Sequence, residues 1–310
     1  MQNTNGHKEA DSTHMSQIFD ALQRSETDRS GTEVSAAKEL LEVVERKAAQ
    51  FATVAESQKK EERALVQSRE FPTARVILAP DNKLVCATDE ESLAAEKFRF
   101  LGVRLRHLQQ KRSMKRIVVT SSVSGEGKST IAGNLACALA RNKQKVLLLD
   151  GDLRRPSLAH QLGMEGLPGL GELLEGNGSQ TSNIYRLESL GFWILPAGST
   201  SRNPLELMQP VKLASLLDQL GNAFDWIVID SPPVLPLADT SIWMRLGDAI
   251  LLVTRPGTTA KRQLQRSLEA IEQSKLLGAV LNGSKEATAN NYHYYHYSHS
   301  AMQTGTRTPK

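Results

Sequence analysis

The chain has 310 residues, 40% of them hydrophobic and 23% charged, with a formal net charge of +4. This composition supports a real hydrophobic core, and so mild a charge argues against a nucleic-acid partner of the histone type. Its two cysteines give neither metal-ligand spacing nor a disulfide framework, and no apolar run approaches the roughly 18 residues that span a bilayer, so we expect a cytoplasmic protein.

In chain order, the first predicted unit is a helical or partly disordered arm over residues 1–73. Within it, Met15–Glu26 places its apolar residues on one helical face, and Val34 to about Val54 repeats them at three- and four-residue steps. These patterns predict helix, with a short coiled coil and a solvated arm as the two open interpretations.

Residues 74–284 form the second predicted unit, in which strand-like and helical runs alternate. The strand-like runs are nearly continuous in apolar character, which predicts burial on both faces of a mostly parallel sheet. We therefore predict a doubly wound α/β domain whose sheet is flanked by helices. The predicted strands are Arg116–Ser122, Lys145–Asp152, Phe192–Gly198, Trp226–Pro232, Ala249–Arg255 and Leu276–Gly283. The predicted helices are Ser129–Arg141, Pro204–Leu220, Ala238–Leu246 and Thr259–Gln273.

The first predicted strand runs directly into a glycine-rich sequence, SVSGEGKST, and then into a helix. Glycine lets the backbone wrap closely around an anion, and the start of a helix adds positive charge there. Lys128 is expected to reach the phosphates of ATP and the Ser129 hydroxyl to bind Mg²⁺. Ser122 stands where such loops usually start with glycine, yet the strand–loop–helix context predicts a P-loop NTPase. The predicted nucleotide-binding residues are Ser124, Gly125, Glu126, Gly127, Lys128, Ser129 and Thr130.

Acidic residues end two of the predicted strands: Asp150 and Asp152 end one, and Asp230 ends another. The carboxyl ends of parallel strands meet at the ligand-binding edge of a sheet, so these side chains should converge on the phosphates. Beside a metal-bound nucleotide, one carboxylate can stay near the metal while another takes a proton from an incoming hydroxyl. The alternative is that they only cap the following turns or helices.

The third predicted unit, residues 285–310, lacks apolar periodicity and is expected to be a flexible tail. Of the five tyrosines in the chain, four lie in this tail, at Tyr292, Tyr294, Tyr295 and Tyr297. An accessible cluster of phenols is a suitable phosphate acceptor, and each phosphate would add about −1.5 to −2 charges. Metal binding by His293, His296 and His299, or no function at all, are the alternatives.

From Glu91 to Tyr297 the sequence resembles the bacterial tyrosine kinase family, cytoplasmic autokinases that accompany polysaccharide polymerisation and export. The resemblance is carried by SSVSGEGKSTIAGNLA, VLLLDGDLRRP, GLPGLGELLEG, ILPAG followed by NPLELM, FDWIVIDSPPVLPLADT and the tyrosine cluster. It implies that neighbouring subunits phosphorylate the four tail tyrosines with ATP. It implies that Asp150, Lys128 and Asp152 are catalytic, with Asp150 as the base. It also implies that Ser129, Asp152 and Asp230 bind Mg²⁺.

The same resemblance implies self-association and a membrane partner. Family members associate through a helix reading E-x-x-R-x-x-R. Glu96 and Arg99 fit, but Gly102 stands where the second arginine is expected, with Arg104 nearby as the alternative. Without a fused membrane segment, the chain resembles the split form that needs a separate, membrane-embedded polysaccharide co-polymerase. Its start at MSQIFDALQRSE is similar to that of stand-alone members, which would make Met15 an alternative start. The basic residues between Arg104 and Arg116 would face that partner or anionic lipid, or form a solvated surface.

Three rival functions use the same nucleotide site. A partitioning or positioning ATPase carries a signature lysine where this chain has Val123. An iron–sulfur carrier needs a close cysteine pair, whereas Cys86 and Cys137 are far apart in the sequence. A catalytically silent polysaccharide regulator that binds ATP stays open at this point.

Overall fold

A computed structural model describes residues 71–284, except 201, 236 and 237. They form a seven-stranded sheet in the order β3-β4-β2-β5-β1-β6-β7, in which only the β3–β4 pair is antiparallel. This confirms the predicted mostly parallel α/β domain. The strands are β1 (Arg116–Ser121), β2 (Val146–Asp150), β3 (Tyr185–Leu187), β4 (Phe192–Leu195), β5 (Trp226–Asp230), β6 (Ala249–Thr254) and β7 (Leu276–Leu281).

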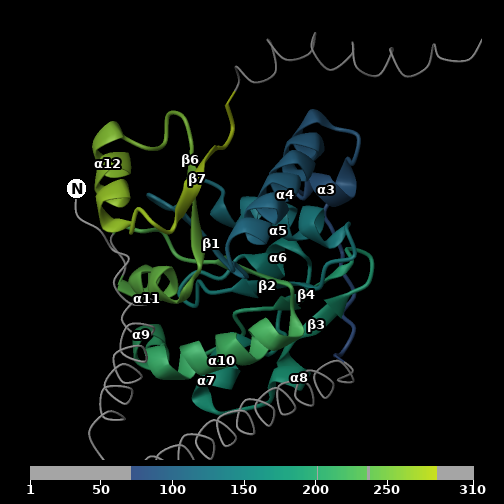
Figure 1. Ribbon diagram of the computed structural model, residues 1–310. Coiled ribbons are helices and arrows are strands. Elements are labelled where there is room, and N and C mark those ends of the chain that lie inside the picture. The colour runs from purple at the N-terminus through teal and green to yellow at the C-terminus, as the bar shows by residue number, and fades with distance from the viewer. Residues whose placement is uncertain (1–70, 201, 236–237, 285–310) are drawn as a thin grey trace, which may run out of the picture. The chain divides into compact units, whose positions relative to one another are not determined.

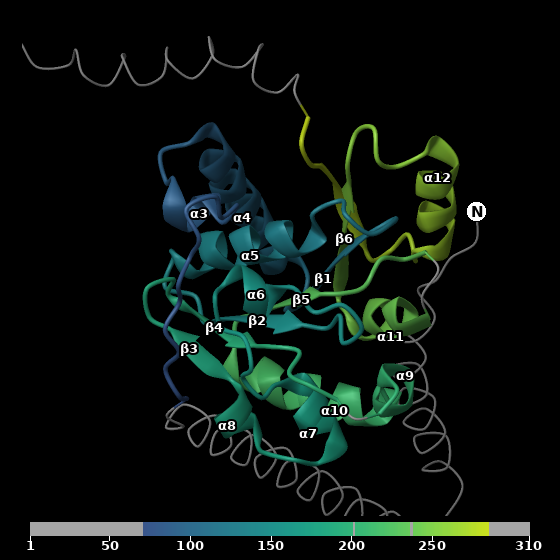
Figure 2. The same cartoon turned by 180° about the vertical axis from the view of Figure 1, so that it is seen from behind.

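Helices cover both faces of the sheet (Figures 1 and 2). One face carries α3 (Val85–Thr88), α4 (Leu93–Lys111), α5 (Lys128–Ala140) and α6 (Leu158–Gln161). The other carries α7 (Leu170–Glu175), α8 (Gln180–Asn183), α9 (Pro204–Leu207), α10 (Pro210–Ala223), α11 (Ala238–Leu246) and α12 (Lys261–Ala270).

Alternate residues of the central strands build two separate hydrophobic cores. Ile117 and Val119 of β1 face the core under α5, whereas Val118 between them faces the core under α10. All three are fully buried. Because successive side chains of a strand point to opposite faces, a strand covered on both sides must be apolar throughout. This explains the continuous apolar runs in the sequence.

The structure divides one predicted helix and adds strand β3 and the short helices α3, α6, α7 and α8. The helix predicted over Pro204–Leu220 is two helices, α9 and α10, because Gln209 is extended (φ −64°, ψ 121°) before Pro210. A residue that precedes proline is driven out of helical geometry, so the break lies where the sequence placed a continuous helix. Strand β3 was not predicted, since its three residues are too few to show a pattern.

The first described residues, 71–73, pack against the domain. The Phe71 ring lies 5.9 Å from that of Phe224, and the Arg186 amide of β3 donates to the Pro72 carbonyl oxygen at 2.8 Å. Residues 71–73, which the sequence analysis assigned to the arm, therefore lie along the edge strand β3. The predictions for residues 1–70 and 285–310 lie outside the described residues.

Candidate functional site

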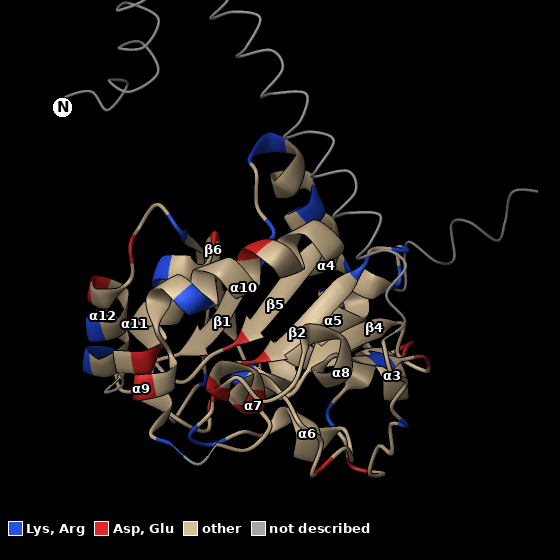
Figure 3. Cartoon of the chain, turned by 90° about the horizontal axis from the view of Figure 1, so that it is seen from below, with Lys and Arg blue, Asp and Glu red and all other residues tan. Residues whose placement is uncertain are grey.

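The strand order places the acidic strand ends together. Strands β2 and β5 are parallel neighbours, and Asp150 and Asp230 are directly paired across them. Strand β1, which leads into the glycine-rich loop, pairs with the other side of β5. The red carboxyl ends of β2 and β5 lie beside each other in Figure 3. The predicted catalytic carboxylates and the phosphate loop thus share one edge of the sheet, as the sequence analysis expected.

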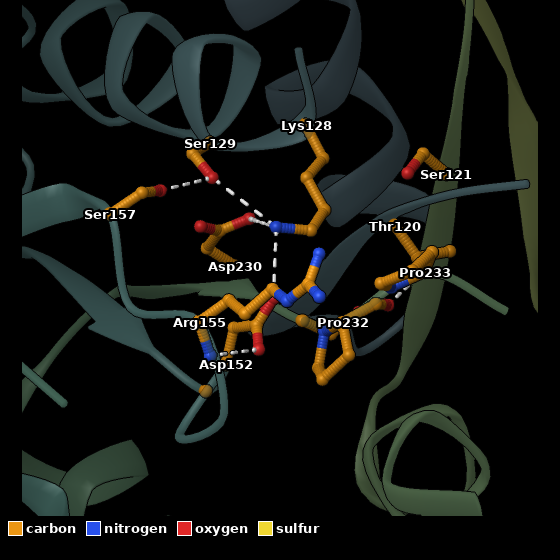
Figure 4. A network of polar contacts seen from close by, with 12 residues as sticks. Thr120, Ser121, Lys128, Ser129, Asp152, Arg155, Ser157, Asp230, Pro232 and Pro233 are labelled. Atoms are coloured by element: carbon orange, nitrogen blue, oxygen red, sulfur yellow. Dashed lines mark hydrogen bonds and ion pairs between the residues drawn. The ribbon is translucent and has the colours of Figure 1, made fainter. Parts of the chain in front are cut away.

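Lys128, the first residue of α5, lies at the centre of this cluster (Figure 4). Its Nζ atom is 3.1 Å from Oδ2 of Asp152, 3.9 Å from Oδ1 of Asp230 and 3.4 Å from the Ser129 hydroxyl. Both carboxylates are almost completely buried. One ammonium group therefore lies near negative charges from the loop after β2 and from the end of β5.

Burial sets the protonation of the cluster. It raises the pKa of Asp230 above its usual range, although the nearby Lys128 charge opposes the rise. It raises the pKa of Asp150 as well, and the charge of Asp230 adds to that rise. For Lys128 burial alone would lower the pKa, but the charges of Asp230 and Asp152 outweigh it and raise the pKa. The lysine is thus a permanent cation, and the two carboxyl groups hold protons more tightly than exposed ones.

Asp150 is held by backbone N–H groups of the segment that follows β2. Its two carboxylate oxygens accept the backbone N–H groups of Asp152 and Leu158, each at 3.2 Å. The side chain of Asp150 is fully buried. This residue is therefore held in place, and its raised pKa makes its ionised form a stronger base than an exposed carboxylate.

The metal-ligand candidates have the donors that Mg²⁺ requires. Both carboxylate oxygens of Asp230 are buried and accept no hydrogen bond from the described residues. Leaving two buried carboxylate oxygens without donors is costly, whereas a hydrated Mg²⁺ would supply both charge and donors. Ser129, whose hydroxyl oxygen accepts a hydrogen bond from Ser157 at 2.8 Å, lies in the same cluster. These residues fit the ion.

The phosphate loop depends on glycine at its end. Gly127 has φ +93°, in the left-handed region, and forms the N-cap of α5. A Cβ atom there would lie 2.2 Å from Nδ2 of Asn282. Asn282 follows β7 and donates to the Glu126 carbonyl oxygen at 2.8 Å. A larger residue at this position would therefore be strained in its backbone and would displace the Asn282 amide from its bond to Glu126.

Glu126, predicted to bind nucleotide, turns its side chain into the protein. Its carboxylate accepts the Val123 amide at 2.8 Å and the hydroxyl of Thr259, which belongs to the turn between β6 and α12. Its carboxylate is therefore engaged inside the protein. Thr259 and Asn282 were not predicted as supports of the loop. The only signal was that Asn282 lies at the end of one predicted strand and that Thr259 starts the predicted helix after another.

The loop after β2 is held against α11 by hydrogen bonds. The Trp243 indole N–H donates to the Gly151 carbonyl at 3.0 Å, and a Cβ atom at Gly151 would lie 2.8 Å from that indole ring. Arg154 forms two hydrogen bonds with the buried carboxylate of Asp239, at 2.5 and 3.2 Å. These contacts fix the segment that carries Asp152. None of these partners was predicted.

The self-association candidates lie together on α4. Arg99 donates from Nε to the Glu96 carboxylate at 2.6 Å, and both side chains are partly exposed. Gly102 is buried, and a Cβ atom there would lie 3.8 Å from the Ala138 carbonyl oxygen of α5. A side chain at 102 would therefore point toward α5, which rules out this position, but not Arg104, as the second arginine of the motif.

Of the six basic residues Arg104, Arg106, Lys111, Arg112, Lys115 and Arg116, the last three have partners within the domain. Arg112 donates to the carbonyls of Ser274 and Asp248, Lys115 donates to that of Gly221, and Arg116 pairs with Asp218. Arg112 thus binds the segments at Asp248 and Ser274, and Lys115 and Arg116 bind α10. The proposed partner or lipid surface is therefore reduced to the remaining basic residues. No helix among the described residues is long and apolar enough to cross a membrane.

The described part of the chain contains only one of the tyrosines, Tyr185, which is buried in β3. The four tyrosines of the tail lie outside the described residues. Both cysteines are buried, Cys86 in α3 and Cys137 in α5. The described residues contain no group of three or more His, Cys, Asp or Glu side chains arranged to hold a metal.

Comparison with known proteins gives a consistent set of relatives. The ParA family model, described as "NUBPL iron-transfer P-loop NTPase", matches residues 112–306. Tyrosine-protein kinase YwqD of Bacillus subtilis is 33% identical over 222 residues, which is 71% of this chain and 94% of YwqD. Tyrosine-protein kinase ptk of Acinetobacter johnsonii is 30% identical over 66% of this chain, but over only 28% of ptk. The kinase domain of Escherichia coli tyrosine kinase ETK superposes with a TM-score of 0.60 at 29% identity, covering 64% of this chain and 79% of that domain.

Proposed function

The chain belongs to the bacterial tyrosine kinase family of P-loop NTPases, and from this premise we propose that it transfers the γ-phosphate of ATP to its own tail tyrosines. The observation that carries the proposal is the buried cluster of Lys128 with Asp150, Asp152 and Asp230 beside a glycine-rich loop. A protein that only binds Mg·ATP needs the lysine, the loop and carboxylates for the metal, whereas Asp150 is the additional carboxylate that can act as a base.

In this proposal, the amide groups of the loop Ser124–Thr130 and the start of α5 bind the phosphates. Lys128 moves from its carboxylates to the β- and γ-phosphates. Mg²⁺ would be held by the Ser129 hydroxyl and by Asp230 and Asp152, where it would neutralise charge on the phosphates.

The transfer itself needs a base and an accessible phenol. The phenol oxygen of a tail tyrosine bonds to the γ-phosphorus as the bond from that phosphorus to the β,γ-bridging oxygen breaks, releasing ADP. Asp150 accepts the phenol proton in its ionised form, which its raised pKa makes a stronger base than an exposed carboxylate. The acceptors are Tyr292, Tyr294, Tyr295 and Tyr297 of a neighbouring subunit, since Tyr185 is buried in the sheet.

We also propose the setting. The kinase would regulate the chain length or export of an exopolysaccharide, together with a separate membrane-embedded co-polymerase, and would lie at the inner face of the membrane through that partner. Self-association would use the α4 face around Glu96 and Arg99. Next to them, Phe100 and Val103 are 67% and 54% exposed, which gives that face the apolar area an interface needs.

The test is a phosphotyrosine measurement. The full chain with ATP and Mg²⁺ should gain phosphate on the four tail tyrosines, detected by mass spectrometry. Lys128→Met should lower this signal by about 100-fold or more, since it removes the cation that faces the phosphates. A variant with the four tail tyrosines changed to phenylalanine should lose the signal but keep ATP binding. ATP hydrolysis without phosphotyrosine would instead support an ATPase switch.

A further inference from the structure

Two consecutive arginines follow the acidic strand β2, and they have different partners. Arg154 is committed to the buried carboxylate of Asp239 in α11 through two hydrogen bonds. Arg155 is held only by its backbone, whose N–H donates to Oδ1 of Asp152 at 3.1 Å. Within the part of the chain that the structure describes, the Arg155 guanidinium has neither a hydrogen bond nor an ion pair.

The Arg155 side chain is directed at the nucleotide site. In Figure 4 it extends from its loop toward Lys128 and Asp152, with its guanidinium group on the side of Pro232. Its backbone bond to Asp152 fixes the point from which the side chain starts. Arg155 is exposed, so it can reach a ligand that enters from solvent.

The negative charges of the carboxylates and of a bound triphosphate favour a second positive side chain in the site. Lys128 already faces Asp150, Asp152 and Asp230, and a triphosphate brings further negative charge into the same buried space. A guanidinium group offers N–H donors in a planar fork that matches two phosphoryl oxygens at once. The cation that lies closest in sequence to the carboxylates and is still unpaired is Arg155.

We propose that Arg155 is a catalytic residue that binds the terminal phosphate of ATP and stabilises the charge on it during transfer. This inference rests on the proposed kinase function. Arg155 exchanges no proton or electron: the phenol–phosphorus bond forms, the bond to ADP breaks, and the guanidinium neutralises the equatorial oxygens. Binding of the β-phosphate and of the adenosine does not involve Arg155.

The decisive measurement compares two nucleotides on the full chain. Arg155→Met should bind the β,γ-imido analogue of ATP about tenfold more weakly than the unmodified protein, with ADP affinity unchanged. Arg155→Lys, which keeps the charge but not the fork, should recover part of the loss. Arg154→Met is the matched contrast: it should lower thermal stability by unpairing Asp239, without changing the ratio of the two affinities.

Equal affinities of Arg155→Met and the unmodified chain for the analogue, or an equal loss for ADP, would overturn the inference. In protein that phosphorylates its tail, Arg155→Met should also slow phosphorylation at saturating ATP at least tenfold. If the chain made no phosphotyrosine yet Arg155→Met still lost affinity only for the analogue, the proposed kinase function would fail while terminal-phosphate binding by Arg155 stood.

Discussion

At the scale of single residues, the buried Asp230 carboxylate destabilises the folded protein, although it is a proposed ligand of Mg²⁺. Its carboxylate is fully buried, lies 3.9 Å from Lys128 and accepts no hydrogen bond from the described residues. Because burial raises its pKa in the folded state, the folded protein binds more protons than the unfolded chain from pH ~4 upward to the raised pKa. Stability is therefore lost as the pH rises through this window and is retained below it.

Asp230→Asn should abolish that cost. Without nucleotide, the variant should be more stable than the unmodified protein at pH 8 by about 1 kcal/mol, or 2–4 °C in melting temperature, and the gain should shrink toward pH 5. It should also lose tail phosphorylation. Asp218→Asn, which removes an exposed carboxylate paired with Arg116, should give at most about 0.5 kcal/mol at either pH. A less stable Asp230→Asn protein at pH 8 would refute this account.

At the scale of structural elements, the phosphate loop is held by parts of the chain far from it in sequence. Glu126 joins the loop to the β6–α12 turn through Thr259 and to the end of β7 through Asn282. When the donor of such a hydrogen bond is removed, a buried acceptor is left unsatisfied, which costs about 1–3 kcal/mol of free energy. We expect this cost to appear as weaker nucleotide binding, although neither Thr259 nor the Glu126 side chain need contact ATP.

Thr259→Val tests this support. The substitution keeps the shape of the side chain but removes the hydroxyl that donates to Glu126, so ATP affinity should fall severalfold and stability by about 1 kcal/mol. Thr258→Val is the matched control, because Thr258 is exposed and only its backbone amide is bonded. Isothermal titration with Mg·ATP measures both variants. Unchanged affinity in Thr259→Val would show that the loop does not depend on this contact.

Elements also mark the limit of what the sequence could predict. The strands β1, β2, β5 and β6 were predicted to within a few residues because burial on both faces leaves an apolar run, and the end of each run located Asp150 and Asp230. The break before Pro210 was missed, although proline signals it, because the apolar pattern continues through it. Thr259, Asn282, Trp243 and Asp239 could not be found, since their contacts depend on which strands become neighbours.

At the scale of the whole domain, the nucleotide site connects the hydrophobic cores on the two faces of the sheet. Its residues come from β1 with α5, from β2 and from β5, and its loop is supported from β6 and β7. A ligand that binds only the folded state should therefore stabilise both hydrophobic cores together. Mg·ADP at 100 times its dissociation constant should contribute about 2.7 kcal/mol, which raises the melting temperature by roughly 5–11 °C in a domain of this size.

Two variants of one strand separate ligand stabilisation from packing. Val118→Ala and Val119→Ala each open a cavity in a different core and should each cost about 2 kcal/mol, yet both should keep the full shift with Mg·ADP. Lys128→Met should lose most of that shift, and EDTA should reduce it in the unmodified protein. Differential scanning calorimetry makes the comparison. Two melting transitions, of which Mg·ADP moves only one, would mean that the cores on the two faces of the sheet unfold independently and that the site stabilises only one of them.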